Sequence, residues 1–369
     1  MIDFQKQIRA LSLLPLVAAL TACGGGSSPS DAGSNASGSS SSGSTGSSST
    51  VVLSGPTLIT VAPATDYTAG TMEDTAVAAL NAARLASGSG ALSHSTALDV
   101  ATTAHANYDT AIYAHGETSQ VPGYPHNEVS TVEPNLYYGD TPLGRIDKAL
   151  GTSVSFADEV VGGAHLFNGS GQMVADGTSC ANGFLGTVYH ADIVLSQATV
   201  MAVAQWQDSI GEQGCIIDLA TTTSYGQVPA SSSAVVNPAP NTTVSGAFDI
   251  DGEQPRPAGG LIPTGTTAGT PVLVNVRNVD WVNAQANGKL APVVNPFTLA
   301  TSGGTQVPAV ILTASGFTGS GVTSDAQLLE GSMVLIPKAT LAAGTYSVHV
   351  DVTLTSGVKV VKDWNFTAQ

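Results

Sequence analysis

Between residues 71 and 116, apolar side chains recur with the period of an α-helix. A first helical stretch is marked by Val77, Leu80 and Arg84. In a second stretch, the residues of one face are spaced three or four apart, as in an amphipathic helix: Leu98, Ala101, His105, Tyr108 and Ile112. Thr96 with Asp99 predicts a capping box at the start of this second helix, and Gly116 predicts its end.

Further along the chain, the pattern predicts one more helix and then strands. Asp140-Thr141-Pro142 supplies a cap and a first-turn proline for a helix that runs to Leu150 and closes at Gly151. Two apolar runs, 198–206 and 215–219, flank Gly211 and Gly214 and predict a hairpin. Helices followed by strands indicate an α+β domain, which we place at residues 56–227.

Residues 228–369 show the alternation of β-strands. Valines alternate with polar residues over 346–354, and Thr355-Ser356-Gly357 turns the chain into a second alternating run, 358–366. Apolar runs at 271–276 and 333–336 add further strands. This region therefore predicts an all-β sandwich of the immunoglobulin-like kind, without the cysteine pair of antibody domains.

The N-terminal residues combine a basic start with a short apolar stretch. Lys6 and Arg9 precede residues 10–20, which are too few to span a bilayer at about 20 residues. This predicts a signal peptide at residues 1–22. Leu20-Thr21-Ala22-Cys23 resembles the bacterial lipobox, so we expect Cys23 to be lipidated and to hold the protein on a membrane through its acyl chains. The alternative is an ordinary signal peptide that happens to contain a cysteine.

The residues after Cys23 bear on location. Gram-negative lipoproteins kept in the inner membrane usually carry Asp at the next position, whereas this chain has Gly24. The resemblance therefore implies the cell envelope, and within it the outer membrane of a Gram-negative bacterium. Nearly all of residues 24–50 are Gly, Ser, Ala, Thr or Asn, which predicts a flexible tether within 23–55 with a span of about 30 Å.

Composition supports an exported protein. Of the 369 residues, 10% are charged, against about 25% in an average soluble domain. The formal charge of -16 and the absence of a Lys or Arg run argue against a nucleic-acid partner. With Cys23 set aside, Cys180 and Cys215 form an even pair in an oxidising compartment, so we expect a disulfide between them.

Candidate chemistry is confined to a few histidines and acids. His115-Gly116-Glu117 places an imidazole and a carboxylate at the end of the second predicted helix. Asp158-Glu159 and His190 could complete a site, since two imidazoles with carboxylates bind a divalent metal or perform acid/base catalysis. The alternative is that these are surface or core-satisfied side chains. His105 lies on the apolar helix face, where we expect a hydrogen-bonded core residue.

Several motifs together resemble bacterial members of the CAP superfamily, the SCP-like domains of cysteine-rich secretory proteins, antigen 5 and pathogenesis-related proteins. They are Leu80-Asn81-Ala82-Ala83-Arg84, Ala104-His105-Ala106-Asn107-Tyr108, His115-Gly116-Glu117, Gly139-Asp140-Thr141-Pro142 with Arg145, Glu159-Val160-Val161 and Tyr189-His190. The resemblance implies an α-β-α sandwich with a central antiparallel sheet. It also implies that His115, Glu159 and His190 belong to the family's cleft tetrad, with Glu117 as the candidate fourth member. Those first three residues would bind zinc or a similar divalent metal.

Two classes of function follow from these patterns. The first is a binding module, with an acidic His-lined cleft for a divalent ion or an apolar site for a lipid or sterol, as the resemblance implies. The second is a metal-assisted hydrolase or protease acting on an envelope or extracellular substrate. The chain has no G-x-S-x-G and no H-E-x-x-H motif, which favours binding over catalysis. Asp249-Ile250-Asp251-Gly252-Glu253 could bind calcium, but without the other ligands of an EF-hand loop a β-turn is favoured.

Overall fold

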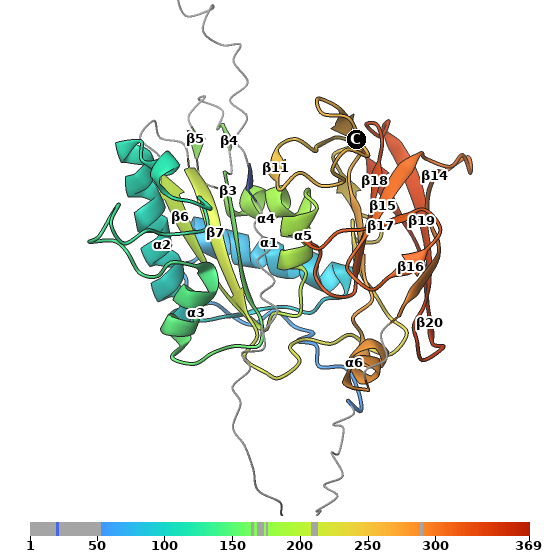
Figure 1. Ribbon diagram of the computed structural model, residues 1–369, viewed down its shortest axis with the longest axis horizontal. Helices are drawn as coiled ribbons and strands as arrows, with labels where there is room; N and C mark the ends of the chain where they lie inside the picture. Colours follow the sequence, from blue (N-terminus) through green and yellow to red (C-terminus); the bar gives the residue numbers. More distant parts are fainter. Residues whose placement is uncertain are drawn as a thin grey trace, which may run out of the picture.

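The computed structural model describes residues 20–21, 53–163, 166–167, 173–174, 176–207, 213–287 and 291–369. Helices and strands both form the core in these ranges, which confirms the α+β class (Figure 1). The predicted lipidation site, Cys23, and most of the predicted signal peptide and tether lie outside the described residues. Among the residues described, no helix is both long enough and apolar enough to cross a membrane.

A four-stranded sheet lies at the centre of the N-terminal half (Figure 1). Its strands follow the order β2, β6, β7 and β3, with the bounds Ser93–His94, Val200–Gln207, Gln213–Ala220 and Ala157–Gly163. β6 and β7 pair antiparallel, which confirms the predicted hairpin. β3 is antiparallel to β7, and β2 is parallel to β6.

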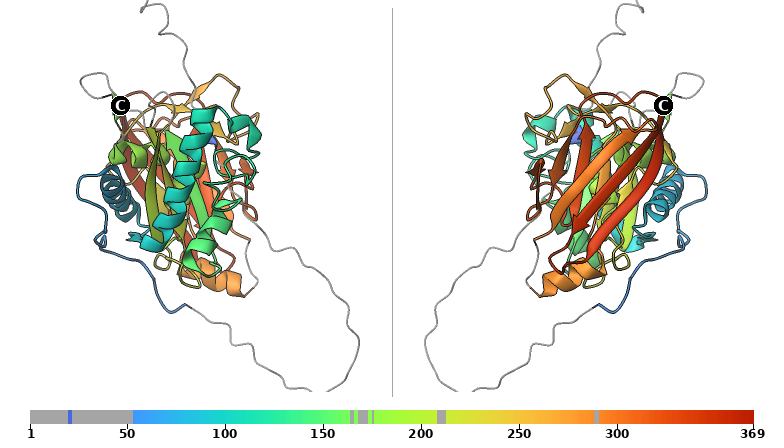
Figure 2. Two further views of the ribbon diagram at one scale, coloured as in Figure 1. Left: turned by 90° about the vertical axis from the view of Figure 1, so that its left-hand side faces the viewer. Right: turned by 90° about the vertical axis from the view of Figure 1, so that its right-hand side faces the viewer.

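Helices cover both faces of this sheet (Figures 1 and 2). One face carries α2 (Thr96–His115) and α3 (Pro142–Leu150), and the other carries α1 (Met72–Ser87), α4 (Gly177–Leu185) and α5 (Tyr189–Val194). Successive side chains of a strand point to opposite faces. Accordingly, Ile216 of β7 packs with Ala106 of α2, whereas Ile217 joins the core that contains Leu80 of α1.

The helix ends follow local sequence signals, with one difference from the prediction. Ser95 is the N-cap of α2, and its hydroxyl accepts from the backbone N–H of Leu98. The predicted cap, Thr96, is therefore wrong by one residue, because Thr96 is already helical. The predicted cap and end of α3 are confirmed, since the Thr141 hydroxyl accepts from Gly144 N–H and Gly151 takes the left-handed conformation.

A disulfide joins Cys180 of α4 to Cys215 of β7, with 6.2 Å between the two Cα atoms. The predicted pairing is thereby confirmed. The bond ties a covering helix to the central sheet across 35 residues of chain, and a crosslink of that length stabilises the fold by about 4 kcal/mol in the chain-entropy account.

The C-terminal half contains two five-stranded sheets packed against each other (Figure 2). The inner sheet follows the order β17, β15, β18, β13 and β8, with the bounds Val322–Ser324, Ala309–Thr313, Ser332–Pro337, Val272–Asn275 and Val235–Asn237. The outer sheet follows the order β16, β14, β19, β20 and β9, with the bounds Thr318–Gly319, Val293–Thr301, Gly344–Thr353, Lys359–Ala368 and Thr243–Val244. The predicted hairpin is confirmed as β19 and β20, whose register places Tyr346 opposite Phe366.

The inner sheet lies between the outer sheet and the helices of the N-terminal half (Figure 1). All six residues of β18 are buried, whereas burial along β19 follows the two-residue alternation of a sheet with one covered face. The sequence of β18 contains a continuous apolar run, Met333 to Ile336, because both faces of this strand are packed.

Shorter elements complete the described chain. These are η2 (Thr118–Gln120), α6 (Val279–Ala286), β1 (Leu20–Thr21), β4 (Leu166–Phe167), β5 (Met173–Val174), β10 (Phe248–Asp249), β11 (Glu253–Gln254) and β12 (Thr267–Ala268). β1 pairs in parallel with β11. Between β10 and β11 the chain makes the favoured β-turn, in which Gly252 N–H donates to the Asp249 carbonyl, and Glu253 points into the protein interior rather than toward a calcium loop.

Candidate functional site

His105 is a fully buried imidazole on the inner face of α2, as the pattern predicted. Its Nε2 donates to the Pro125 carbonyl at 2.8 Å, and its Nδ1 lies 3.0 Å from Glu128 Oε1. Burial alone would lower the pKa of His105, but the charge of Glu159, with that of Asp109 and the Glu128 hydrogen bond, raises this pKa to about 9. His105 therefore carries a positive charge at neutral pH.

Glu159, on β3, is the buried centre of the site. Its Oε2 accepts from Arg145 Nη2 at 2.7 Å, and its Oε1 lies 3.0 Å from His126 Nδ1 and 3.5 Å from His105 Nε2. Burial opposes ionisation, yet Arg145 and His105 hold the pKa of Glu159 far below its ordinary value. The carboxylate is ionised, and Arg145 and His105 neutralise it.

Glu128 holds the loop that contains His126 in place against the rest of the site. Its Oε2 accepts from the backbone N–H groups of Tyr138 and Gly139, at 2.6 and 3.2 Å. Arg145, from α3, returns to the same loop by donating to the His126 carbonyl at 2.9 Å. Hydrogen bonds therefore connect α2, α3, β3 and the loop between α2 and α3 in one network.

Two further carboxyl groups lie buried beside this network. Asp109 has no hydrogen-bond donor among the described residues, and its Oδ2 lies 3.8 Å from His105 Nε2. Burial raises the pKa of Asp109 to about 7. Asp218 accepts from the Thr102 hydroxyl at 2.8 Å, and burial, together with the charge of Glu159, raises its pKa to about 8. Both groups therefore hold protons up to neutral pH.

His190, predicted as a cleft residue, is fully buried at the start of α5. Its Nδ1 lies 3.6 Å from Glu253 Oε1, and its ring lies 5.3 Å from that of Phe184. Burial, and secondarily the charge of His126, lowers the pKa of His190 to about 3. The imidazole is therefore neutral and belongs to the contact between α5 and the C-terminal half.

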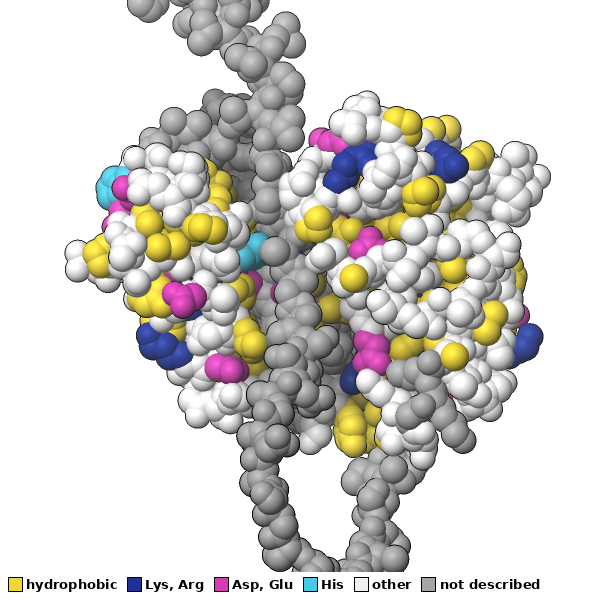
Figure 3. All heavy atoms as spheres, viewed as in Figure 1, with side chains coloured by type: hydrophobic (Ala, Val, Ile, Leu, Met, Phe, Trp, Pro, Cys, Tyr) yellow, Lys and Arg dark blue, Asp and Glu magenta, His cyan; other side chains and the backbone are white. Residues whose placement is uncertain are grey.

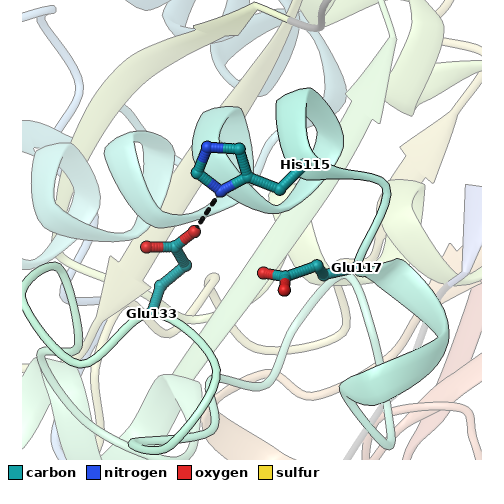
Figure 4. A group of neighbouring side chains, drawn as sticks. All are labelled: His115, Glu117 and Glu133. Carbon is teal, nitrogen blue, oxygen red and sulfur yellow. Dashed lines mark hydrogen bonds and ion pairs between the residues drawn. The ribbon is translucent and has the colours of Figure 1, made fainter.

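His115 lies elsewhere, as the last residue of α2, with 59% of its side chain exposed. It is hydrogen-bonded to Glu133, and Glu117 approaches the same point (Figure 4). One ligand atom from each of these three side chains lies within 4.8 Å of the other two. Within the described ranges, no other set of three His, Cys, Asp or Glu residues meets this criterion.

Among the described residues, the structure does not bring His115, Glu159 and His190 together as one group of metal ligands. His115 projects from the open end of α2, Glu159 is neutralised inside the molecule by Arg145, and His190 faces the C-terminal half. Glu117, the candidate fourth member, lies beside His115 and not in the buried network.

The sequence contains a signal for the residues that were missed. His126-Asn127-Glu128 repeats the His-x-Glu spacing of His115-Gly116-Glu117, eleven positions further along the chain. Only the second pair reaches Glu159. Spacing alone does not distinguish the two pairs, because their burial depends on how the loop after α2 folds back on the helix.

A groove of about 400 Å³, lined by uncharged side chains, lies between the two halves. α1 and α4 contribute Ala83, Asn182 and Leu185, and the C-terminal half contributes Asn237 and Val244. Its volume falls in the range of small-ligand pockets. Charged side chains are also sparse on the face drawn in Figure 3, so charge-based recognition is confined to few places on that face.

Comparisons with known proteins leave the family open. No family model matches the sequence, and no curated protein matches it. Among solved structures, a selenomethionine form of PcoC, a copper resistance protein from Escherichia coli, is 15% identical, with 36% of this chain and 95% of that chain covered and a TM-score of 0.21. CopC from Methylosinus trichosporium OB3b is 14% identical, with 36% and 88% covered and a TM-score of 0.20. At such TM-scores the likeness carries no argument about this chain.

Proposed function

We propose that this protein is an envelope lipoprotein of the CAP superfamily that acts as a tethered binding module and not as an enzyme. The observation that carries the proposal is the closed network around Glu159. His105, His126 and Arg145 are all buried and all engaged with that carboxylate. A general acid or base must reach its substrate, and a metal needs an unneutralised ligand. The network meets neither requirement.

The proposed architecture is a CAP-type α-β-α sandwich followed by an immunoglobulin-like sandwich, carried on a tether from Cys23. Helices on both faces of an antiparallel core support the first part, and two packed β-sheets support the second. In this reading the buried network holds α2, α3 and β3 together, and ligands bind outside it. The groove between the two halves fits a small neutral or amphipathic ligand by its size and its uncharged side chains.

The anchor is tested by Cys23→Ser in the full chain. We expect the variant to leave the membrane fraction or to remain uncleaved, because acylation requires the thiol. Mature-length protein that still fractionates with the membrane would remove the lipoprotein proposal.

The structural role of the network is tested by Glu159→Gln. Removing one charge of a buried pair leaves Arg145 uncompensated, so we expect a loss of about 3–5 kcal/mol in the free energy of unfolding. We expect no hydrolysis of peptide, ester or glycan substrates by either the wild type or the variant. Turnover by the wild type that a folded Glu159→Gln protein lacks would establish the enzymatic alternative instead.

A further inference from the structure

His115, Glu117 and Glu133 come from three different pieces of local structure and meet at one point (Figure 4). His115 ends α2. Gly116 then takes the left-handed conformation, and Glu117 N–H bonds back to the Ile112 carbonyl, so the chain reverses and keeps Glu117 beside the helix end. Glu133 arrives from the loop between α2 and α3.

That loop is fixed to α2, which places Glu133 reproducibly. Tyr108 donates its hydroxyl to the Val129 carbonyl and accepts from Val129 N–H, at 3.2 and 2.8 Å. Val129 and Val132 also pack against Tyr108 and Ile112 of the helix. The group is therefore assembled by the fold of the loop and does not depend on a chance meeting of mobile side chains.

Apart from the contact between His115 and Glu133, no side-chain cation of the described residues pairs with the two carboxylates of the group. Across the described part of the chain, neither Glu117 nor Glu133 forms an ion pair with Lys or Arg. The carbonyl end of α2 adds the negative end of a helix dipole at the same place. Two carboxylates, a helix C-terminus and a solvent-facing imidazole together favour a bound cation.

We propose that His115, Glu117 and Glu133 form a divalent-metal site on the surface, with zinc as the fitting ion. An imidazole nitrogen with two carboxylate oxygens is a zinc donor set, whereas calcium and magnesium take oxygen ligands. Zinc bonds of about 2.0–2.2 Å place ligand atoms about 3.5 Å from each other, a small adjustment from their present separations within 4.8 Å. Three protein ligands leave a fourth position for water or a ligand from outside.

This site goes beyond the proposed binding module and does not depend on the lipid anchor or on the buried network. It is separate from Glu159, so Glu159→Gln and the site variants report on different features. Glu117 also accepts from Gln120 Nε2 at 3.3 Å, a contact that orients the carboxylate from outside the ligand set.

The experiment is calorimetric titration of the full chain with zinc chloride, comparing the wild type with Glu117→Gln and His115→Ala. We expect one zinc per chain in the wild type and an affinity reduced at least about tenfold in each variant, because even indirect metal contacts contribute that much. Glu117 is partly exposed and its hydrogen bond with Gln120 lies at the surface, so its variant should keep the wild-type circular dichroism and unfolding midpoint.

His349→Ala is the matched control. His349 is also a partly exposed imidazole paired with one acid, Asp363 at 2.7 Å, but among the described residues it belongs to no three-ligand group. We expect this variant to bind zinc like the wild type. No zinc binding by the wild type, undiminished binding in the two site variants, or an equal loss in His349→Ala would each overturn the proposal.

Discussion

Four buried carboxyl groups, two in the network and two beside it, share one guanidinium and two imidazoles. Glu128 and Glu159 receive hydrogen bonds from several donors, whereas, within the described part of the chain, Asp109 receives none and Asp218 receives one. Burying an ionised carboxylate without partners is costly, so the less well paired groups keep their protons. The network therefore contains two kinds of acid: charged groups that hold it together and neutral groups beside them.

This division predicts how stability depends on pH. Asp109 and Asp218 have folded-state pKa values of about 7 and about 8, above the unfolded value, so the folded protein binds their protons more tightly. Their contribution is complete below the unfolded pKa of about 3.9 and is lost as pH rises through the folded values. The raised pKa of His105, about 9, also makes the stability of the folded protein fall as pH rises. We expect urea midpoints to fall between about pH 6 and about pH 9.

At low pH the dependence of stability on pH is reversed, so stability falls as the pH falls. The folded-state pKa of His190, about 3, lies below its unfolded value. Its contribution to stability is therefore lost as pH falls from about 6.5 toward 3. Glu159, whose pKa is also depressed, loses its contribution as pH falls through its own range. Stability should therefore be greatest in mildly acidic solution.

Asp109→Asn isolates one of these groups. The substitution removes a charge that must form in the interior at high pH, so we expect it to raise the free energy of unfolding at about pH 8.5 on the order of 1 kcal/mol and to flatten the pH dependence. Asp363→Asn, at an exposed carboxylate, is the control. An unchanged slope in Asp109→Asn would show that Asp109 does not titrate in this range.

At the level of elements, the sequence predicted what local chemistry determines. α3 is bounded by Thr141 and Gly151 as expected, because cap hydroxyls and left-handed glycines act within a few residues. The β19–β20 hairpin follows from alternation alone. The meeting of His126 with Glu159 depends instead on a loop folding over α2, which no local pattern specifies. For the same reason, no local pattern specifies that His115 meets Glu133.

The close approach of α1 and α4 at Gly177 can be tested by substitution. A Cβ at Gly177, the first residue of α4, would lie 2.1 Å from the Met72 carbonyl oxygen and 2.2 Å from Ala76 N, both backbone atoms of α1. We expect Gly177→Ala to cost about 1–3 kcal/mol of stability, because the two helices must move apart. Thermal and urea unfolding would measure the loss.

Gly183, in the same helix, is the matched control. Nothing lies within 4 Å of a Cβ built there, and its backbone is helical. Gly183→Ala should therefore stabilise the protein by about 0.5–1 kcal/mol through reduced freedom of the unfolded chain. If both alanine variants shifted stability in the same direction, close helix approach at Gly177 would not be the determining factor.

At the level of the whole molecule, the two halves share buried polar groups. Glu253, from the C-terminal half, accepts from the backbone N–H groups of Val188, Tyr189 and His190 at the start of α5. In return, Asp192 of α5 accepts from Leu329 N–H and from the Ser332 hydroxyl. The change in hydrophobic pattern along the sequence predicts a boundary near residue 227, but it does not reveal that each half completes hydrogen bonds of the other.

Because separating the halves would expose these groups and the apolar inner sheet, we expect the two halves to unfold together. Calorimetry of the full chain should show a single transition with equal calorimetric and van't Hoff enthalpies. Glu253→Ala leaves three backbone N–H groups at the start of α5 without their acceptor, so it should lower the stability of the whole molecule by about 1–3 kcal/mol. Two resolved transitions in the wild type, or a Glu253→Ala variant with an unchanged midpoint, would mean that the halves fold independently and that the α5 contact contributes little.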